Sequence, residues 1–201
     1  MPLTTAIFDV GHVLFEWDPR FLFAKLIDDP EELDWFQGNV VTGDWHFEAD
    51  SGRPLAVMLE ERIALFPAHE AMIRAYAERW TETVPGPVPG SHAIVRELDE
   101  RGVPLFAITN FGHEFWAMFR PEQPIFDLFE DILVSGTEKL VKPDAAIYAL
   151  AIKRFAVDPD ACLFIDDRIE NVRGAQAAGM HGHVFKDAET LKAELEAVGL
   201  L

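Results

Sequence analysis

Two short apolar runs, far apart in the chain, both end on acidic residues, and this pattern constrains the fold more than any other feature. The runs are Ile7-Phe8-Asp9 and Leu163-Phe164-Ile165-Asp166-Asp167. Short apolar runs bounded by turn residues predict buried strands. In an open α/β sheet, the carboxyl ends of parallel strands form the ligand-binding edge. We therefore expect three carboxylates from two strands to meet at that edge and to form a site for a divalent cation.

The second half of the chain alternates between strand-like and helix-like segments. Strands are predicted near 104–109, 132–135, 162–165 and 183–185, and helices over 91–101, 145–155 and 169–178 and at the C-terminus, with Asp144 as a helix N-cap. Repeats of this kind predict a parallel sheet covered by helices on both faces. The expected fold class is α/β, with a Rossmann-like core.

The first half interrupts this alternation. The strand ending at Asp9 and the one ending at Thr109 lie 100 residues apart, whereas a simple βαβ unit needs only about 30. Residues 16–88 have helical patterns, with helices expected over 20–27 and 68–83 among others. This segment is bounded by Asp18-Pro19 and by a proline- and glycine-rich stretch at 85–90. We therefore expect an all-helical cap over residues 16–88, inserted into an α/β core of residues 1–15 and 89–201.

Charge and composition exclude several classes of partner. The formal net charge is −18, which argues against nucleic acid or an anionic membrane as the main partner. Cys162 is the single cysteine, so no intramolecular disulfide can form. The N-terminus lacks the basic region of a signal peptide, and no apolar run approaches the ~20 residues that span a bilayer. We expect a cytoplasmic protein, whose oligomeric state the pattern does not fix.

Polar residues at the predicted strand ends suggest phosphoryl chemistry. They are Asp9, Thr109 with Asn110, Asp166 with Asp167, and Lys142 ahead of the helix at 145–155. Oxygen-only ligands suit Mg²⁺, which leaves coordination positions open for water and substrate phosphate. A lysine and a hydroxyl stabilise the charge of a transferring phosphoryl group. Asp9 could then attack phosphorus, and the substrate would be a small phosphorylated metabolite.

The chain resembles the haloacid dehalogenase superfamily in four motifs. These are Phe8-Asp9-Val10-Gly11-His12, Ile108-Thr109-Asn110, Lys142-Pro143 and Ile165-Asp166-Asp167-Arg168-Ile169-Glu170-Asn171. They stand in family order, and the resemblance covers nearly the whole chain. Each motif alone is weak, but the four together are specific. The helical insertion after the first motif is similar to the superfamily's C1 cap.

The resemblance implies roles for individual residues. Asp9 is the nucleophile and a Mg²⁺ ligand, the Gly11 carbonyl and Asp167 complete the protein ligands, and Asp166 lies in or next to the coordination sphere. Thr109 and Asn110 hold the phosphoryl group, and Lys142 neutralises Asp9 and the phosphate. Asn171 orients the loop that carries Asp167.

One position departs from the usual phosphatase pattern. Most phosphatases of the superfamily carry a second aspartate two residues after the nucleophile, which protonates the leaving group, whereas this chain has Gly11. This form is similar to a branch that includes bacterial α-D-glucose-1-phosphate phosphatases, and the string at 116–122 also resembles that branch. The implied substrate is a sugar phosphate. His12 could supply the missing proton; alternatively, it only stabilises the turn after the strand.

In the predicted cap, Trp45 and His46 are candidates for a substrate-facing surface. The alternative is that aromatic residues here pack the small helical module.

Two other functions remain compatible with the sequence. A 2-haloacid dehalogenase also uses the first aspartate as nucleophile, attacks carbon and needs no metal. Such enzymes usually carry tyrosine where this chain has Gly11, and the acidic pair at 166–167 favours a cation. A degenerate member that only binds a phosphorylated ligand would explain the missing acid.

Overall fold

The computed structural model describes residues 2–201 and has a five-stranded parallel sheet at its centre. The strand order is β3-β2-β1-β4-β5. The strands are β1 (Thr5–Phe8), β2 (Leu105–Thr109), β3 (Asp131–Val134), β4 (Cys162–Asp166) and β5 (His181–Val184). Because β1 lies between β2 and β4, the residues that follow these three strands meet at one edge of the sheet. The predicted α/β fold with a parallel sheet is confirmed.

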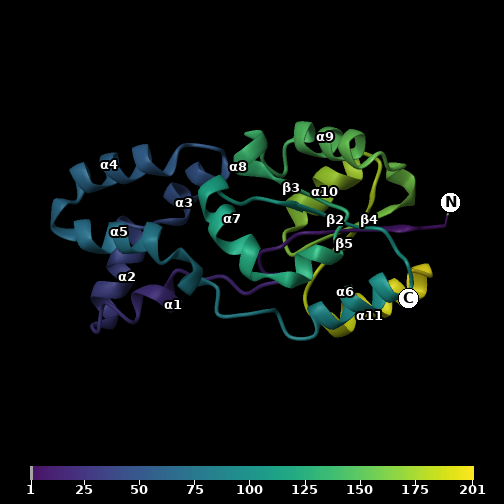
Figure 1. Ribbon diagram of the computed structural model, residues 1–201, viewed down its shortest axis with the longest axis horizontal. Coiled ribbons are helices and arrows are strands. Elements are labelled where there is room, and N and C mark those ends of the chain that lie inside the picture. The colour runs from purple at the N-terminus through teal and green to yellow at the C-terminus, as the bar shows by residue number, and fades with distance from the viewer. Residues whose placement is uncertain (1) are drawn as a thin grey trace.

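Helices cover both faces of this sheet (Figure 1). The helices α9 (Ala145–Phe155) and α10 (Ile169–Ala177) lie on one face, and α6 (Ser91–Glu100) and α11 (Ala188–Val198) on the other. Strand residues alternate between them: Ile7 and Phe164 pack in one buried cluster with Tyr148 of α9, whereas Phe8 packs in the other with Leu98 of α6. Burial on both faces explains why the strands are apolar at every position.

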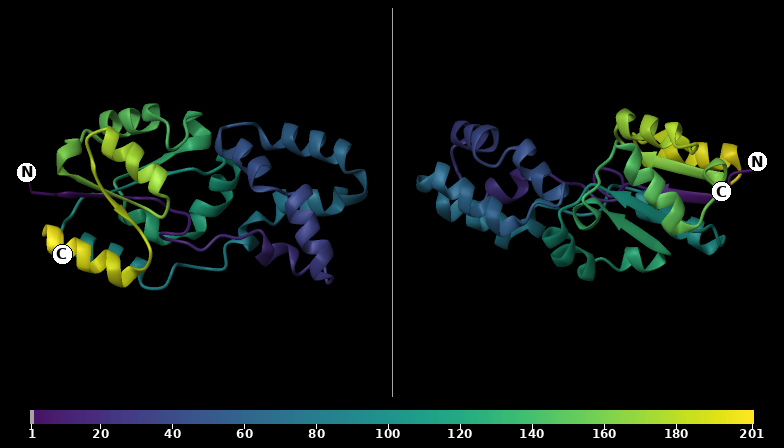
Figure 2. Two further views of the ribbon diagram at one scale, coloured as in Figure 1. Left: turned by 180° about the vertical axis from the view of Figure 1, so that it is seen from behind. Right: turned by 90° about the horizontal axis from the view of Figure 1, so that it is seen from above.

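The helices between β1 and α6 form a group of their own beyond the carboxyl edge of the sheet (Figure 2). This group, called the cap below, contains α1 (Arg20–Phe23), α2 (Pro30–Asn39), α3 (Gly43–Asp50), α4 (Leu55–Leu65), α5 (Glu70–Glu78) and a 3₁₀ turn at Trp80–Thr83. Both chain termini lie at the opposite end of the molecule (Figure 1). Two further short helices, α7 (His113–Phe119) and α8 (Ser135–Glu138), follow β2 and β3 and face the cap.

The segments that enter and leave the cap run beside each other. The Glu16 N–H donates to Gly86 O at 3.0 Å, the Asp18 N–H to Thr83 O at 2.9 Å, and the Val88 N–H to Leu14 O at 3.0 Å. These backbone bonds tie the two connections into one narrow stem. The stem coincides with the proline-rich boundaries that mark the insertion in the sequence.

Local structure departs from the predicted elements at four places. The helix expected over 20–27 ends at Phe23, because a new helix begins at Pro30, with Asp29 as its N-cap. The helix expected over 68–83 is divided into α5 and two 3₁₀ turns. Asp144 occupies the N-cap position of α9, but its side chain accepts no cap hydrogen bond within residues 2–201. The strand expected at 183–185 instead spans His181–Val184, because its pairing with β4 begins at His181, opposite Leu163.

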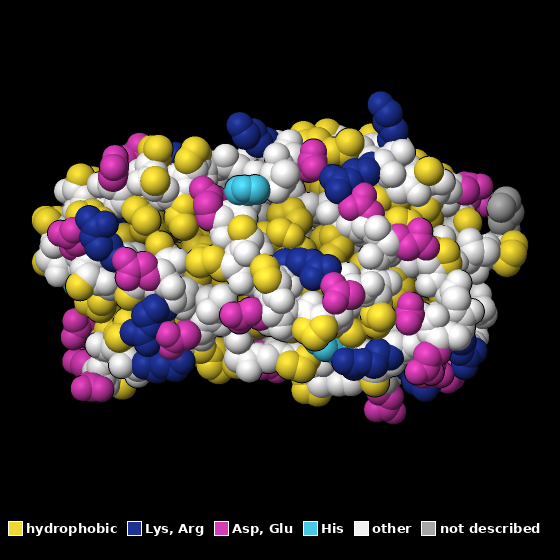
Figure 3. Space-filling model, viewed as in Figure 1, with side chains coloured by type: hydrophobic (Ala, Val, Ile, Leu, Met, Phe, Trp, Pro, Cys, Tyr) yellow, Lys and Arg dark blue, Asp and Glu magenta, His cyan; other side chains and the backbone are white. Residues whose placement is uncertain are grey.

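Charged side chains of both signs are spread over the surface. On the face drawn in Figure 3, acidic and basic side chains are interspersed among hydrophobic ones. Within residues 2–201, no helix combines the length and apolar character needed to cross a bilayer.

A substitution at Gly136 tests how tightly the cap packs on the core. A Cβ added at Gly136 would lie 2.6 Å from His113 N, 2.7 Å from Phe111 O and 3.0 Å from Ala49 O. All three atoms are backbone and cannot rotate away. We expect Gly136→Ala to lower the free energy of unfolding by about 1–3 kcal/mol, measured by urea denaturation.

Gly38 is the matched control, because a Cβ at this position of α2 meets nothing within 4 Å. Gly38→Ala should be neutral or stabilising by up to roughly 1 kcal/mol through helix propensity. Equal effects of the two substitutions would contradict the packing argument.

Candidate active site

A pocket of about 420 Å³ lies where the cap meets the carboxyl edge of the sheet. Its volume is within the range of small-molecule sites, roughly 300–1,000 Å³. The core contributes Asp9, Gly11, Lys142 and Asp167 to its lining, and the cap contributes residues of α3 and of the 3₁₀ turn at Trp80–Thr83. A ligand in this pocket would therefore contact both parts of the chain.

Three carboxylates gather at the core end of this pocket. Asp9 follows β1, Asp166 ends β4 and Asp167 comes next. The parallel pairing of Phe8 with Ile165 places Asp9 beside Asp166. One oxygen from each of the three carboxyl groups lies within 4.8 Å of the others. This oxygen-only set fits the ligand preference of Mg²⁺, so the residues present suit the predicted cation.

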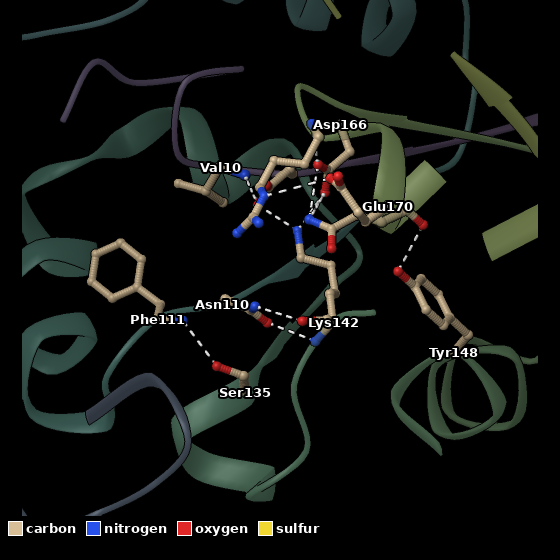
Figure 4. A network of polar contacts seen from close by, with 11 residues as sticks. Val10, Asn110, Phe111, Ser135, Lys142, Tyr148, Asp166 and Glu170 are labelled. Carbon is tan, nitrogen blue, oxygen red and sulfur yellow. Dashed lines mark hydrogen bonds and ion pairs between the residues drawn. The ribbon is translucent and has the colours of Figure 1, made fainter. Parts of the chain in front are cut away.

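Lys142 places a buried positive charge among these carboxylates (Figure 4). Its Nζ lies 2.8 Å from Asp9 Oδ1 and 2.7 Å from Asp166 Oδ2. The side chain of Lys142 is 1% exposed. Burial acts to lower its pKa, but the two carboxylates outweigh burial and raise the pKa above the usual lysine value. The ammonium is therefore charged throughout the neutral range.

Asp166 is saturated with hydrogen bonds from its neighbours. Besides Lys142, it accepts from the Arg168 N–H at 2.9 Å and from Asn171 Nδ2 at 2.9 and 3.0 Å. Burial acts to raise the pKa of Asp166, yet Lys142 and these donors hold it below the usual carboxyl value. Asn171 is itself fixed, because Tyr148 Oη donates to its carbonyl at 2.8 Å. Asp166 thus stays ionised and holds Lys142 in place.

Asp9 and Asp167 behave differently from Asp166. Burial and the nearby Asp166 raise the pKa of Asp9, although Lys142 opposes the shift. Burial and Asp166 likewise raise the pKa of Asp167. The cluster therefore has more negative charge than Lys142 can balance. A divalent cation would supply the missing positive charge and displace protons from these carboxyls.

Thr109 and Asn110 of the second motif, both expected to hold the phosphoryl group, have different surroundings. The hydroxyl of Thr109 is buried at the end of β2, and its Oγ1 has no hydrogen-bond partner among residues 2–201. An unpaired buried hydroxyl fits a phosphoryl oxygen as its missing partner. Asn110 is engaged at both ends of its amide: Nδ2 donates to Lys142 O at 3.0 Å, and Oδ1 accepts from the Lys142 N–H at 2.9 Å. Its side chain fixes the lysine loop.

The remaining candidates lie at different depths. His12 and His46 line the pocket together with Asp9, Gly11, Asn110, Lys142 and Asp167. His12 sits at a φ of 57° and closes the turn after β1 by donating its N–H to Phe15 O at 2.7 Å. Trp45 lies inside the cap, where Arg62 stands 5.2 Å over its ring. Of the two cap candidates, His46 faces the pocket and Trp45 packs the module.

Asp50, at the end of α3, is a pocket residue that the sequence did not reveal. It is 6% exposed, lines the pocket, and its Oδ1 has no hydrogen-bond partner in the described part of the chain, residues 2–201. Burial raises its pKa, while His46 and the Gly112 N–H oppose the shift. A buried carboxyl in a pocket with a raised pKa is a candidate functional group. In the sequence, Asp50 is one acidic residue of a helical segment, and nothing near it indicates that its side chain faces a pocket.

A neutral substitution at Asp167 tests the charge balance of the three carboxylates and Lys142. Because the folded-state pKa of Asp167 is raised, its ionisation costs stability as the pH rises from the ordinary carboxyl pKa through the folded-state value. We expect Asp167→Asn to raise the thermal midpoint at neutral pH in buffer containing a chelator. The gain should shrink as the pH falls toward the ordinary carboxyl pKa.

Asp99→Asn, at an exposed position of α6, is the control and should leave the midpoint unchanged. A lower midpoint for Asp167→Asn at neutral pH would show that favourable contacts of this carboxylate exceed the repulsion.

Comparison with known proteins places the chain in a family. The profile of haloacid dehalogenase-like hydrolases matches residues 5–179. The sesquiterpene phosphatase astK of Aspergillus oryzae is 31% identical over 186 residues, which covers 91% of this chain and 90% of that protein.

Solved structures share the fold at lower identity. A haloacid dehalogenase family enzyme from Bacteroides thetaiotaomicron, in complex with magnesium and inorganic phosphate, superposes with a TM-score of 0.72 at 19% identity, covering 92% of this chain and 95% of that one. The L-2-haloacid dehalogenase of Xanthobacter autotrophicus gives 0.63 at 18% identity, covering 99% and 84%. From the profile match and the relative of equal length, the chain belongs to the haloacid dehalogenase-like hydrolases, as an enzyme of the phosphatase type.

Proposed function

We propose that the protein is a Mg²⁺-dependent phosphatase that cleaves a small phosphorylated metabolite through a phosphoaspartate on Asp9. The observation that carries this proposal is the buried Lys142 between Asp9 and Asp166, with the third carboxylate of Asp167 beside them. This arrangement places a nucleophile, a fixed positive charge and a cation site at the end of one pocket. Phosphoryl transfer needs these three elements together.

The reaction divides into two displacements at phosphorus. In the first, an Asp9 carboxylate oxygen attacks phosphorus, and the bond between phosphorus and the alcohol oxygen breaks. In the second, water attacks the phosphoaspartate, releases phosphate and restores Asp9. Lys142 balances the charge of the phosphoryl oxygens, and the unpaired Thr109 hydroxyl donates to one of them. Mg²⁺ held by Asp9, the Gly11 carbonyl and Asp167 would supply Lewis-acid stabilisation to the same oxygens.

Two sources bear on the substrate. The resemblance to the glucose-1-phosphate branch points to a sugar phosphate. The relative of equal length is named a sesquiterpene phosphatase, which points to the phosphate of an apolar alcohol. Both are small phosphorylated metabolites, and in both the phosphate would lie beside Asp9 and Lys142.

A 2-haloacid dehalogenase is the second candidate, because such an enzyme shares the fold. That chemistry attacks carbon and needs no cation. The acidic cluster weighs against it, since Asp167 adds a carboxylate with a raised pKa beside the nucleophile. An uncompensated carboxylate there is a cost to a metal-free enzyme and a ligand to a metal-dependent one.

Asp9→Asn separates these functions. We expect Mg²⁺-dependent phosphate release from p-nitrophenyl phosphate, abolished by chelator and lowered by a factor of at least roughly 1,000 in Asp9→Asn. Asp99→Asn is the control and should retain wild-type activity. Chloride release from 2-chloropropionate in the presence of chelator, without phosphate release, would instead identify a dehalogenase.

The leaving alcohol needs a proton, and Gly11 has no side chain to provide one. Two pocket residues can do so. His12 lies next to the metal-binding turn, and Asp50 lies across the pocket on α3 with a pKa raised toward the protonated form. General acid catalysis matters most where the leaving group is a poor one.

Comparing leaving groups identifies the donor. Loss of the true acid should lower kcat for an alkyl phosphate by roughly 100-fold or more and leave p-nitrophenyl phosphate much less affected. We expect this selective loss in either His12→Asn or Asp50→Asn, measured by phosphate release on both esters. Equal losses on the two esters would assign the residue to structure or binding, and undiminished turnover would exclude it.

A further inference from the structure

The pocket has two chemically different ends. The core end carries Asp9, Asn110, Lys142, Asp167 and Asn171, which suit a phosphoryl group and its cation. The rest of the lining includes six aromatic side chains, called the aromatic wall below: Phe15, Trp17, Phe47, Trp80, Phe111 and Phe119. Figure 4 shows Phe111, one residue of this wall, on the side of Lys142 away from Tyr148. A phosphate ester placed at Asp9 would therefore direct its alcohol portion to the aromatic side chains.

The rings of the wall hold one another in place. Phe15 packs edge-on against Phe119 at 4.9 Å between centroids, Phe119 stacks with Phe111 at 5.7 Å, and Phe111 meets Trp80 at 4.9 Å. These four residues come from the segment after β1, from the cap, from the loop after β2 and from α7. Because their rings pack on rings of other segments, this part of the wall is formed before any ligand arrives, which lowers the entropic cost of binding.

Polar groups on the cap side are largely engaged with one another. The imidazole of His46 contacts Tyr76 Oη through Nδ1 at 2.7 Å and faces Asp50 Oδ1 through Nε2 at 3.5 Å. Trp17 stacks on the His46 ring at 4.7 Å. Burial lowers the pKa of His46, so that the ring is neutral. Among the described residues of this end, Asp50 Oδ1 and the indole N–H groups of Trp17 and Trp80 are polar but have no hydrogen-bond partner.

We infer that the alcohol portion of the substrate is a hydrocarbon, aromatic or isoprenoid, that packs on the aromatic wall while its phosphate lies at Asp9 and Lys142. This inference rests on the proposed phosphatase function and adds the substrate class. One hydroxyl or bridging oxygen of such an ester can meet Asp50. The other atoms of the alcohol portion would face mainly the rings of the wall.

A sugar ring would fit this end poorly. A sugar phosphate brings several hydroxyl groups, and each loses water on entering the pocket. A buried hydroxyl without a hydrogen-bond partner is costly. The wall offers mainly ring faces, with the indole N–H groups of Trp17 and Trp80 as its donors, which are too few for the several hydroxyl groups of a sugar. A hydrocarbon, in contrast, gains by leaving water. The pocket therefore discriminates against the polar alcohol and in favour of the apolar one.

Three phosphate esters test this preference. Phenyl phosphate and 2-naphthyl phosphate have similar leaving groups and differ by one apolar ring, and glucose 1-phosphate supplies the polar alternative. We expect kcat/KM for the naphthyl ester to exceed that for the phenyl ester by about tenfold or more, because single apolar groups are discriminated on this scale in apolar pockets. Glucose 1-phosphate should be a weaker substrate than either.

Phe47 offers a variant that keeps the fold intact. It lines the pocket and is 39% exposed, and Phe21, in another helix of the cap and outside the pocket, is 44% exposed. Phe47→Ala should reduce the naphthyl-to-phenyl ratio at least about threefold, and the matched Phe21→Ala should leave it unchanged. Thermal midpoints of both variants show whether they are folded.

A binding assay keeps this inference separate from the proposed function. Trp17 and Trp80 belong to the wall, so a bound apolar ligand should change their fluorescence. Naphthylmethylphosphonate should quench it at lower concentration than methylphosphonate, and Phe47→Ala should weaken this difference. Turnover without an apolar preference, or a preference for glucose 1-phosphate, would overturn the inference and leave the phosphatase standing. Absence of phosphate release from every ester would overturn the proposed phosphatase function. The phosphonate binding assay would then show by itself whether the wall prefers an apolar group.

Discussion

The ammonium of Lys142, shared between Asp9 and Asp166 in the interior, is the interaction on which the site depends. Removing one partner from a buried ion pair leaves an uncompensated charge, typically at a cost of about 3–5 kcal/mol. Lys142 stands between two carboxylates at 2.8 and 2.7 Å, so the loss of the lysine would leave two buried negative charges. The pairing of β1 with β4 brings the carboxylates together, and the amide of Asn110 fixes the lysine loop from β2. Three neighbouring strands thus combine to place one charge.

The two carboxylates beside Lys142 have unequal environments, and this inequality separates their functions. Asp166 receives donors from Lys142, Arg168 and Asn171, which satisfy its oxygens. A carboxylate so engaged is a poor nucleophile and a good anchor. Asp9 accepts from Lys142 and from the Val10 N–H, and its raised pKa marks a group whose negative charge lacks full compensation. In the proposed reaction, binding of a cation and ionisation of Asp9 would therefore be coupled, since each favours the other.

How much the sequence predicts depends on whether a feature is local to one strand end. Asp9, Thr109 and Asp166 directly follow or end buried strands, so the pattern of apolar runs is sufficient to place them at one edge of the sheet. Asp50 and the aromatic wall lack such a signal, because their residues come from separate segments that meet only when the cap folds onto the core. The helix expected over 68–83 was wrong for a related reason: tertiary contacts of Trp80 with Phe111 and Phe115 accompany a break after α5 that helical periodicity does not reveal.

The two ends of the pocket tolerate different kinds of substitution. The core end is built from strand termini whose carboxylates share Lys142, so substitutions there alter the charge balance around Asp9. The cap end is built from rings that pack on one another across the stem and α7, and their shape can change without moving Asp9 or Lys142. If the proposed roles hold, a chain with this architecture would keep one phosphoryl-transfer site and acquire a different alcohol preference through substitutions in the wall. The entry and exit segments, paired through Glu16 with Gly86 and Asp18 with Thr83, set the position of that wall over the nucleophile.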